Sequence, residues 1–486
     1  MFVFEGGDNM SDTHYKTFQI WTKKGHRLFP YFQQMCQNAK NLYNMNNFYI
    51  RQIYTAFRQE NRRQPLQQEV LDTLQQHVGV MNERQLQAYQ SKLAKEQQKP
   101  VDERKEVRCN AFDLPSEESP FVDYHFLDSL FKVMGQTDYR ALPTQCSQWV
   151  MKGVFQNWSS FFASLKDYRL HPEKYTGKPR IPSYCRAQEK EVQFTNQDCV
   201  IKAGKFLKFP KTKQQLNIGK LGTTEGKLKQ VRVIPRHGQY VVELIFECPL
   251  ETAALDKDRY MSIDLGIDNL ATLVTTTGLR PVLVKGKHIK AINQYYNKMK
   301  AYYTGILRHG KHPKEGQHTS KRLERLHHIR HRKTKDLFHK ASYRIVQLAV
   351  EQNIGTIIIG LNQGWKQGAS IGKRNNQTFC HIPHQMLIAM ITYKAIEQGI
   401  DVQITEEAYT SKAYTSKASF MDQDPLPRYE EGKTRLFSGQ RIKRGLYKWK
   451  NGLINADVNG AANILRKVVP TASANGIRST SSAISA

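Results

Sequence analysis

The stretch DRYMSIDLGIDNLATLVTTTGLRPVLVKG, at residues 258–286, decides the fold of the second half of the chain. It holds three short apolar runs separated by turns that contain glycine or proline, and turns this tight join neighbouring antiparallel strands. The pattern therefore predicts a meander of three strands. Asp264 follows the first strand and precedes Gly266, where the backbone can turn sharply.

The segments after the meander alternate between helical and extended patterns. The predicted elements are a helical hairpin at 289–353 interrupted near 310–316, the strand TIIIGL at 356–361, a helix at 384–398, the strand DVQIT at 401–405, and a last helix from about 458. An antiparallel meander followed by alternating helices and strands is the order of an α/β RNase H-like fold.

The N-terminal half has a different character. Residues 31–98 are rich in Gln, Asn and Arg with apolar residues at helical spacing, whereas residues 176–250 form short alternating runs split by Gly, Pro and Asn, typical of a small β-barrel. The predicted divisions are an N-terminal extension and first strand (1–30), a helical region (31–175), a β-rich domain (176–255), the α/β domain (256–470) with a basic loop region (408–456), and a disordered tail (471–486).

Charge limits the class of partner. The formal net charge is +30, and a surplus this large is typical of proteins that bind a polyanion, with nucleic acid the first candidate and a membrane surface the second. Apolar runs stay below the roughly 18 residues of a membrane span, and the N-terminus lacks the pattern of a signal peptide, so we expect a cytoplasmic, nucleoid-associated protein. The seven cysteines form no C-x-x-C pair, which predicts neither a disulfide framework nor a zinc site.

The helical hairpin carries much of the positive charge. From Lys285 to Arg344 there are 17 Lys or Arg residues against three acids, too few for ion pairs to make this an ordinary solvated helix face. Tyrosines interleave with the cations, as in surfaces that bind phosphates and stack bases. The predicted nucleic-acid contacts, including three in the later basic loop, are Tyr295, Lys298, Lys300, Arg308, Lys321, Arg322, Arg325, Arg330, Arg332, Lys333, Arg441, Lys443 and Arg444.

Acidic residues stand where predicted strands and helices begin or end. Asp264 follows the first strand, Glu406 and Glu407 follow DVQIT, and Asp457 opens the last helix. Carboxylates converging from separate elements can hold two Mg²⁺ or Mn²⁺ ions for phosphodiester cleavage. Taken singly, these residues also fit a turn residue, a solvated strand end and a helix N-cap, and spacing alone leaves those alternatives open.

Several motifs resemble the TnpB/OrfB family of transposon-encoded proteins, which are relatives of type V CRISPR effectors. The matching motifs are SIDLGIDNLAT (262–272), NADVNGAANILRKV (455–468), YTSKA at 409–413 and again at 414–418, LPTQCSQWVMKGVFQNWSSFF (142–162) and GKPRIPSY (177–184). The resemblance implies a wedge-like β-barrel with a helical recognition insert, followed by a RuvC nuclease domain. It also implies a guide RNA from the transposon end and cleavage of double-stranded DNA beside a short motif.

Two departures from the family pattern bear on the site. Gly360 stands where the family usually has the glutamate of its second motif. The resemblance then implies that Glu407, or Glu406 as second choice, joins Asp264 and Asp457 as a metal ligand, since only one of two successive residues can face the site. Residues 408–456 contain no cysteine, so we expect no zinc there.

Three functions remain open at the level of sequence. An RNA-guided, metal-dependent DNA endonuclease fits all the motifs. The missing glutamate at Gly360 motivates an alternative, an RNA-guided DNA-binding regulator without nuclease activity. The acidic residues alone would also permit a transposase that acts directly on DNA ends.

Overall fold

The computed structural model divides the chain into two compact units, Met1–Pro249 and Leu250–Ala486. It describes residues 13–58, 63–250, 254–312, 315–361, 377, 380–405, 417–426, 436–443, 445–471 and the backbone of 484–485. In this part of the chain, every helix is too short or too polar to cross a membrane.

The first unit combines helices with two antiparallel sheets. Its helices are α1 (Phe29–Ala56), α2 (Pro65–Gln97), α3 (Tyr124–Val133), α4 (Thr137–Ala141) and α5 (Thr144–Leu170). Its strands are β1 (Thr13–Thr22), β2 (Val192–Thr195), β3 (Val200–Lys202), β4 (Phe206–Lys208), β5 (Gln215–Asn217), β6 (Lys227–Arg236) and β7 (Gln239–Pro249). The sheet orders are β1-β7-β6-β2 and β3-β4-β5, so the five helices are inserted between two strands of one sheet. Closure into a barrel stays a prediction.

The core of the first unit combines aliphatic residues with several large aromatic ones. Trp158 of α5 is fully buried, and its indole Nε1 donates to Asn47 Oδ1 of α1 at 2.9 Å. This bond satisfies the one polar atom of the ring, so the helix pair gains the hydrophobic burial without an unpaired donor. The apolar stripe of α5 is therefore used to pack the helical insert.

The second unit is built on one mixed sheet. Its principal elements are β8 (Asp256–Asp264), β9 (Asn269–Thr275), β10 (Val282–Lys285), α6 (Lys287–Arg308), α7 (Lys321–Glu351), β11 (Ile354–Gly360), α9 (His384–Glu397), β12 (Asp401–Thr405), β13 (Gln440–Lys443), β14 (Leu446–Trp449), β15 (Gly452–Asn455) and α11 (Ala456–Val468). The strand order is β12-β11-β8-β9-β10, followed by the two-residue strand β16 (Ile484–Ser485). The rest of the predicted disordered tail beyond residue 471 lies outside the described residues.

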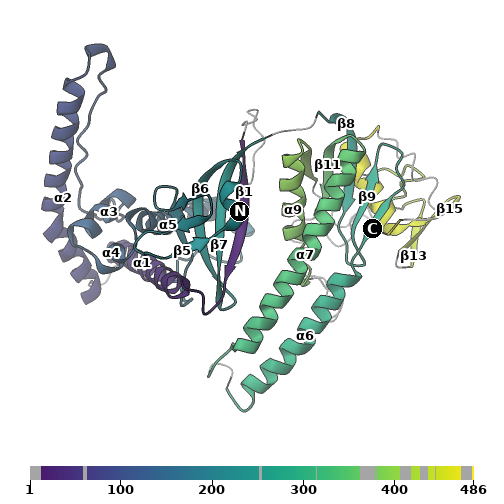
Figure 1. The fold of residues 1–486 in the computed structure, drawn as a ribbon, viewed down its shortest axis with the longest axis horizontal. Helices are drawn as coiled ribbons and strands as arrows, with labels where there is room; N and C mark the ends of the chain where they lie inside the picture. Colours follow the sequence, from purple (N-terminus) through teal and green to yellow (C-terminus); the bar gives the residue numbers. More distant parts are fainter. Residues whose placement is uncertain are drawn as a thin grey trace. The chain divides into compact units, whose positions relative to one another are not determined.

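The predicted meander and alternation are confirmed by this order. β8, β9 and β10 pair antiparallel, whereas β11 pairs parallel with β8, and β12 parallel with β11. α6 and α7 form the predicted helical hairpin, and Figure 1 shows them as two long arms lying side by side.

Alternation along the strands assigns each residue to one face of the sheet. Met261 and Ile263 of β8 belong to the core cluster that includes residues of α7 and α9. Ser262 lies between them, and its hydroxyl donates to the Ala461 carbonyl of α11 at 2.7 Å. Asp264 shares the parity of Ser262, so it is directed to the face covered by α11.

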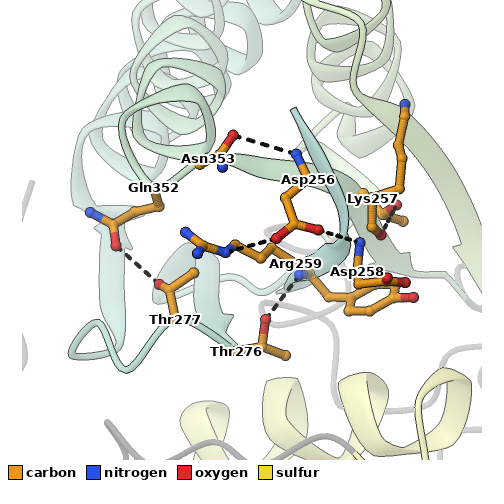
Figure 2. A network of polar contacts seen from close by, with 10 residues as sticks. Asp256, Lys257, Asp258, Arg259, Thr276, Thr277, Gln352 and Asn353 are labelled. Atoms are coloured by element: carbon orange, nitrogen blue, oxygen red, sulfur yellow. Dashed lines mark hydrogen bonds and ion pairs between the residues drawn. The ribbon is translucent and has the colours of Figure 1, made fainter. Parts of the chain in front are cut away.

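The amino end of β8 is fixed by a polar network (Figure 2). The Asp256 backbone N donates to Asn353 Oδ1 at 3.4 Å, and Arg259 Nε lies 3.1 Å from Asp256 Oδ2. Thr277 Oγ1 donates to Gln352 Oε1 at 3.0 Å. A Cβ on Gly355 would lie 2.6 Å from the Asp256 carbonyl oxygen, so glycine is required where β11 begins beside β8. This network joins the amino end of β8 to the residues just before β11.

Candidate active site

Asp264 is the last residue of β8, and the tight turn after it fixes its place. The Gly266 backbone N donates to the Leu270 carbonyl at 3.4 Å, and a Cβ on Gly266 would lie 2.6 Å from the Asn269 carbonyl oxygen. The turn therefore needs glycine, as the sequence predicts. The His384 imidazole Nε2 also donates to the Gly266 carbonyl at 3.0 Å, and His384 is 1% exposed. This buried bond ties the turn to the first residue of α9.

Asp457 is the second residue of α11, and it is not the N-cap. The cap is Asn455, whose side chain accepts hydrogen bonds from the backbone N of Asp457 at 2.9 Å and of Val458 at 3.3 Å. The N-cap alternative for Asp457 is therefore wrong, because the preceding asparagine already supplies that function. The carboxylate of Asp457 is left to contact other groups.

Those groups come from two other elements. Asp457 Oδ2 accepts a hydrogen bond from Asn269 Nδ2 at 2.7 Å, and Arg441 Nη2 lies 3.6 Å from Asp457 Oδ1. Asn269 is 8% exposed and begins β9, so it is a buried amide that holds a carboxylate. Its Oδ1 accepts a second bond from Lys285 Nζ at 3.4 Å. Residues of the β8–β10 meander thus hold the Asp457 carboxylate in its orientation.

The two aspartates lie on the same face of α11. A Cβ on Gly460 would lie 3.0 Å from Asp264 Oδ2, so the Asp264 carboxylate rests against the helix where there is no side chain. Asp457 stands three residues before Gly460, a spacing that places both positions on one helical face. The structure therefore brings together the first and last predicted acidic residues.

The third carboxylate that the sequence predicts would follow strand β12. The parallel pairs Ile359↔Ile263 and Gly360↔Thr405 bring the carboxyl ends of β8, β11 and β12 to one edge of the sheet. Glu406 and Glu407 follow Thr405 directly but lie outside the described residues. Within the described residues, no three His, Cys, Asp or Glu side chains gather as a metal cluster. The choice between the two glutamates stays a prediction.

Polar side chains hold the region between β12 and α11 where a zinc site is not expected. The Ala418 carbonyl accepts hydrogen bonds from Asn459 Nδ2 and Asn463 Nδ2, both at 2.8 Å. Asp424 Oδ2 accepts from the backbone N of Ser419 at 2.8 Å and of Ser438 at 3.0 Å. Ala418 is the last residue of the second YTSKA copy, and residues 414–416 of that copy lie outside the described residues. The first copy lies outside the described residues.

The predicted nucleic-acid contacts on the hairpin fall into two groups. The exposed members lie on α6 and α7 and are Tyr295, Lys298, Lys300, Lys321, Arg322, Arg325, Arg332 and Lys333. Arg330 instead donates to Asn293 Oδ1 and to the His381 carbonyl, both at 2.8 Å. Arg308 donates to the carbonyls of His312 and Glu315. These two arginines brace the hairpin, and their binding role stays a prediction.

The basic loop contacts are placed in part. Arg441 and Lys443 are exposed residues of β13, and Arg444 lies outside the described residues. Arg441 lies beside Asp457, a contact that the sequence analysis did not predict. Sequence reasoning missed Asn269 and His384, although each is a polar residue at the start of a largely apolar element.

Two family models match the chain. Residues 242–366 match the OrfB_IS605 model, described as a probable transposase, and residues 384–464 match the TNB domain of Cas12f1-like proteins. Together these segments contain Asp264 and Asp457. No curated protein matches the chain.

Solved structures of three nucleoprotein complexes are similar at low identity. A Cas12f1–sgRNA–target DNA complex has 12% identity and a TM-score of 0.43, covering 93% of this chain and 99% of that chain. A CRISPR-Cas12f ternary complex has 11% sequence identity and a TM-score of 0.32, and the match covers 82% of this chain and 81% of that chain. C2c1 from Alicyclobacillus acidoterrestris in complex with single-guide RNA has 10% sequence identity and a TM-score of 0.29, and the match covers 88% of this chain and 70% of that chain.

Proposed function

We propose that this TnpB-like chain is an RNA-guided DNA endonuclease that depends on divalent metal ions. Its family rests on the two matched segments, 242–366 and 384–464, and on the motifs around Asp264 and Asp457. The observation that supports the proposal is that the Asp264 carboxylate lies against Gly460 of α11, three residues along the same helix from Asp457.

The residues present suit Mg²⁺ or Mn²⁺. Asp264 and Asp457 offer hard oxygen donors of the kind that these ions prefer. We assign Asp264, Asp457 and Glu407 as ligands, with Glu406 as the alternative to Glu407. When bound, such ions activate a water and stabilise charge on the leaving oxygen of a phosphodiester.

Each neighbouring side chain has a role in this arrangement. Asn269 orients the Asp457 carboxylate, and outer groups of this kind keep a ligand in its binding geometry. Arg441 lies close enough to Asp457 to pair with it, and it can turn to a phosphate of the incoming strand. His384 restrains the turn after Asp264.

The exposed cations of the hairpin suit the nucleic acids that this function requires. We propose that they contact phosphates of a guide RNA from the transposon end and of its double-stranded DNA target, next to a short adjacent motif. Base pairing would then read the sequence, while the protein binds the backbone.

Plasmid cleavage with the native guide RNA and Mg²⁺ tests the proposal. Wild type should cleave, and Asp264→Ala should bind guide RNA and target without cleaving. One of Glu406→Ala and Glu407→Ala should behave like Asp264→Ala, which identifies the third ligand. Cleavage that persists in Asp264→Ala contradicts the assigned site. A wild type that binds its target but never cleaves it supports the regulator instead.

A further inference from the structure

The α6–α7 hairpin contains a small cavity that the proposed catalytic chemistry does not use. The cavity measures about 220 Å³ and lies between the two helices shown side by side in Figure 1. Its lining includes Ile292 and Tyr295 of α6 and Leu326, Ile329, Arg330 and Lys333 of α7. The α7 residues recur at spacings of three and four, so they form one face of that helix.

The volume and lining of the cavity favour a small, largely apolar group. Pockets for drug-sized ligands are roughly 300–1,000 Å³, so this cavity suits a single ring system better than a whole cofactor. Tyr295 is 61% exposed and Ile329 is 37% exposed at its edge, while Leu326 is buried. A planar aromatic group entering here would contact aliphatic side chains and one accessible tyrosine ring.

The positive charge beside the cavity indicates which class of molecule would supply such a group. Lys333 is an exposed cation of the cavity lining, and Lys298 is exposed on α6 beyond Tyr295. The hairpin as a whole carries 17 Lys or Arg residues against three acids. An apolar slot surrounded by cations is complementary to a polynucleotide, whose bases are flat and whose backbone is anionic.

The neighbouring tyrosines have different surroundings. Tyr296 also lines the cavity, but its ring is buried: it is 6% exposed, its hydroxyl is hydrogen-bonded to His327 Nδ1 at 2.9 Å, and Arg330 lies 4.7 Å from its ring centre. Tyr302 is 61% exposed but does not line the cavity. Tyr295 is therefore the residue that combines an accessible ring with the cavity.

We propose that this cavity binds one unpaired nucleobase of a single-stranded polynucleotide, stacked on Tyr295, with Lys333 near the adjoining phosphate. A base inside a duplex is already stacked on both faces, so the site would distinguish single strands and strand ends from continuous duplex. The inference requires that the chain binds a polynucleotide, as the proposed function does, but not that it cleaves one.

Photocrosslinking of the full-length chain tests the proposal. A short single-stranded DNA carrying 5-iodouracil couples to an aromatic ring that stacks on the base, and peptide mass spectrometry identifies the residue. We expect coupling at Tyr295, retained in Tyr295→Phe and lost in Tyr295→Ala. Tyr302→Ala is the matched control, because Tyr302 is equally exposed on the same helix, and it should leave the coupling unchanged.

Competition measures the contribution of the base. A stacked base contributes about 1–3 kcal/mol, so an abasic oligonucleotide of the same length should compete at least about fivefold more weakly. Tyr295→Ala should remove this difference. Equal competition by the abasic strand in wild type, or coupling at Tyr302 in place of Tyr295, overturns the proposal.

Base binding at Tyr295 is separable both from cleavage and from a packing role of the same side chain. Asp264→Ala should couple like wild type, so a failure of cleavage is distinguishable from a failure of base binding. If Tyr295→Ala lowers the unfolding temperature as loss of a core residue does, while Tyr302→Ala does not, the cavity is covered by the protein's own chain, and the proposal is wrong.

Discussion

At its amino end, strand β8 carries Asp256 and Asp258, and at its carboxyl end it carries Asp264. At the amino end, Asp256 pairs locally with Arg259 at 3.1 Å, and those side chains are 38% and 48% exposed. Such exposed pairs contribute only about 0–1 kcal/mol each.

The carboxyl end arranges its acids differently. Asp264 is half-buried against Gly460 of α11, and Asp457, a residue of the same helix, has its carboxylate held by the buried amide of Asn269. Residue type is the same at both ends of β8. Burial and convergence from distant segments distinguish a candidate metal site from a structural network.

The largest expected effect contrasts the two ends directly. Asp457→Asn should reduce DNA cleavage by about three orders of magnitude, because loss of a metal ligand removes several kcal/mol of transition-state stabilisation. Asp256→Asn should leave the cleavage rate within about twofold, since exposed ion pairs contribute little. Single-turnover rates with guide RNA measure both, and equal losses in the two variants would remove the distinction.

A second prediction uses the missing side chain at Gly460. Gly460→Ala places a Cβ 3.0 Å from Asp264 Oδ2, which must shift the carboxylate. Cleavage should fall about tenfold to a hundredfold, because small misplacements of reacting groups cost that much. Alanine favours a helix by about 1 kcal/mol over glycine, so thermal stability should not fall in parallel.

Gly305 provides the matched control for this substitution. It lies in α6, and a Cβ there would meet nothing within 4 Å. Gly305→Ala should keep full cleavage. If Gly460→Ala is as active as Gly305→Ala, the Asp264 carboxylate does not need its present position.

A third prediction concerns Asn269. Asn269→Ala removes the 2.7 Å bond to Asp457, and the loss of such outer groups reduces metal affinity or activity about 10- to 100-fold. The Mg²⁺ concentration needed for half-maximal cleavage should rise. Thr277→Ala, in the amino-end network, should leave that concentration unchanged; a parallel rise would point to general loosening of the sheet.

The smallest expected effect concerns two histidines of α7, His327 and His339, which lie away from both ends of β8. Burial, and then nearby lysine and arginine side chains, lowers the pKa of His327 and His339 from the ordinary value of 6.5. At pH values between the folded and the ordinary pKa, these histidines bind more protons in the unfolded chain than in the folded one. Their contribution to the free energy of unfolding is therefore fully present above pH 6.5 and is lost as the pH falls below that value. Thermal unfolding should therefore occur at lower temperature at about pH 5.5 than at about pH 7.5.

Two single variants check the origin of that pH dependence. His327→Gln should reduce the difference between the two unfolding temperatures, whereas substitution of exposed His288 by Gln should not. Unfolding temperatures that change equally in both variants would assign the pH dependence to other groups.

Local patterns predicted much of this fold. Alternation and tight turns gave the meander around Asp264, and helical spacing gave the α6–α7 hairpin, because both signals depend on residues close in sequence. The convergence of Asp264 with Asp457 followed only from the family resemblance. Neither periodicity nor composition brings together residues this far apart.

Contacts between distant side chains could not be predicted. The bond from Asn269 to Asp457 depends on the packing of α11 over β9, and Arg330 bracing Asn293 depends on how the hairpin meets the segment before α9. A cation in a basic helix has the same sequence signature whether it faces solvent or a buried amide.

Binding of Mn²⁺ to the full-length protein, followed by electron paramagnetic resonance, tests the metal site without requiring cleavage. Wild type and Asp256→Asn should bind the ion with the same affinity, whereas Asp264→Asn and Asp457→Asn should each bind it at least about tenfold more weakly. An Asp264→Asn variant that binds Mn²⁺ as tightly as wild type would contradict the assignment of Asp264 and Asp457 as metal ligands.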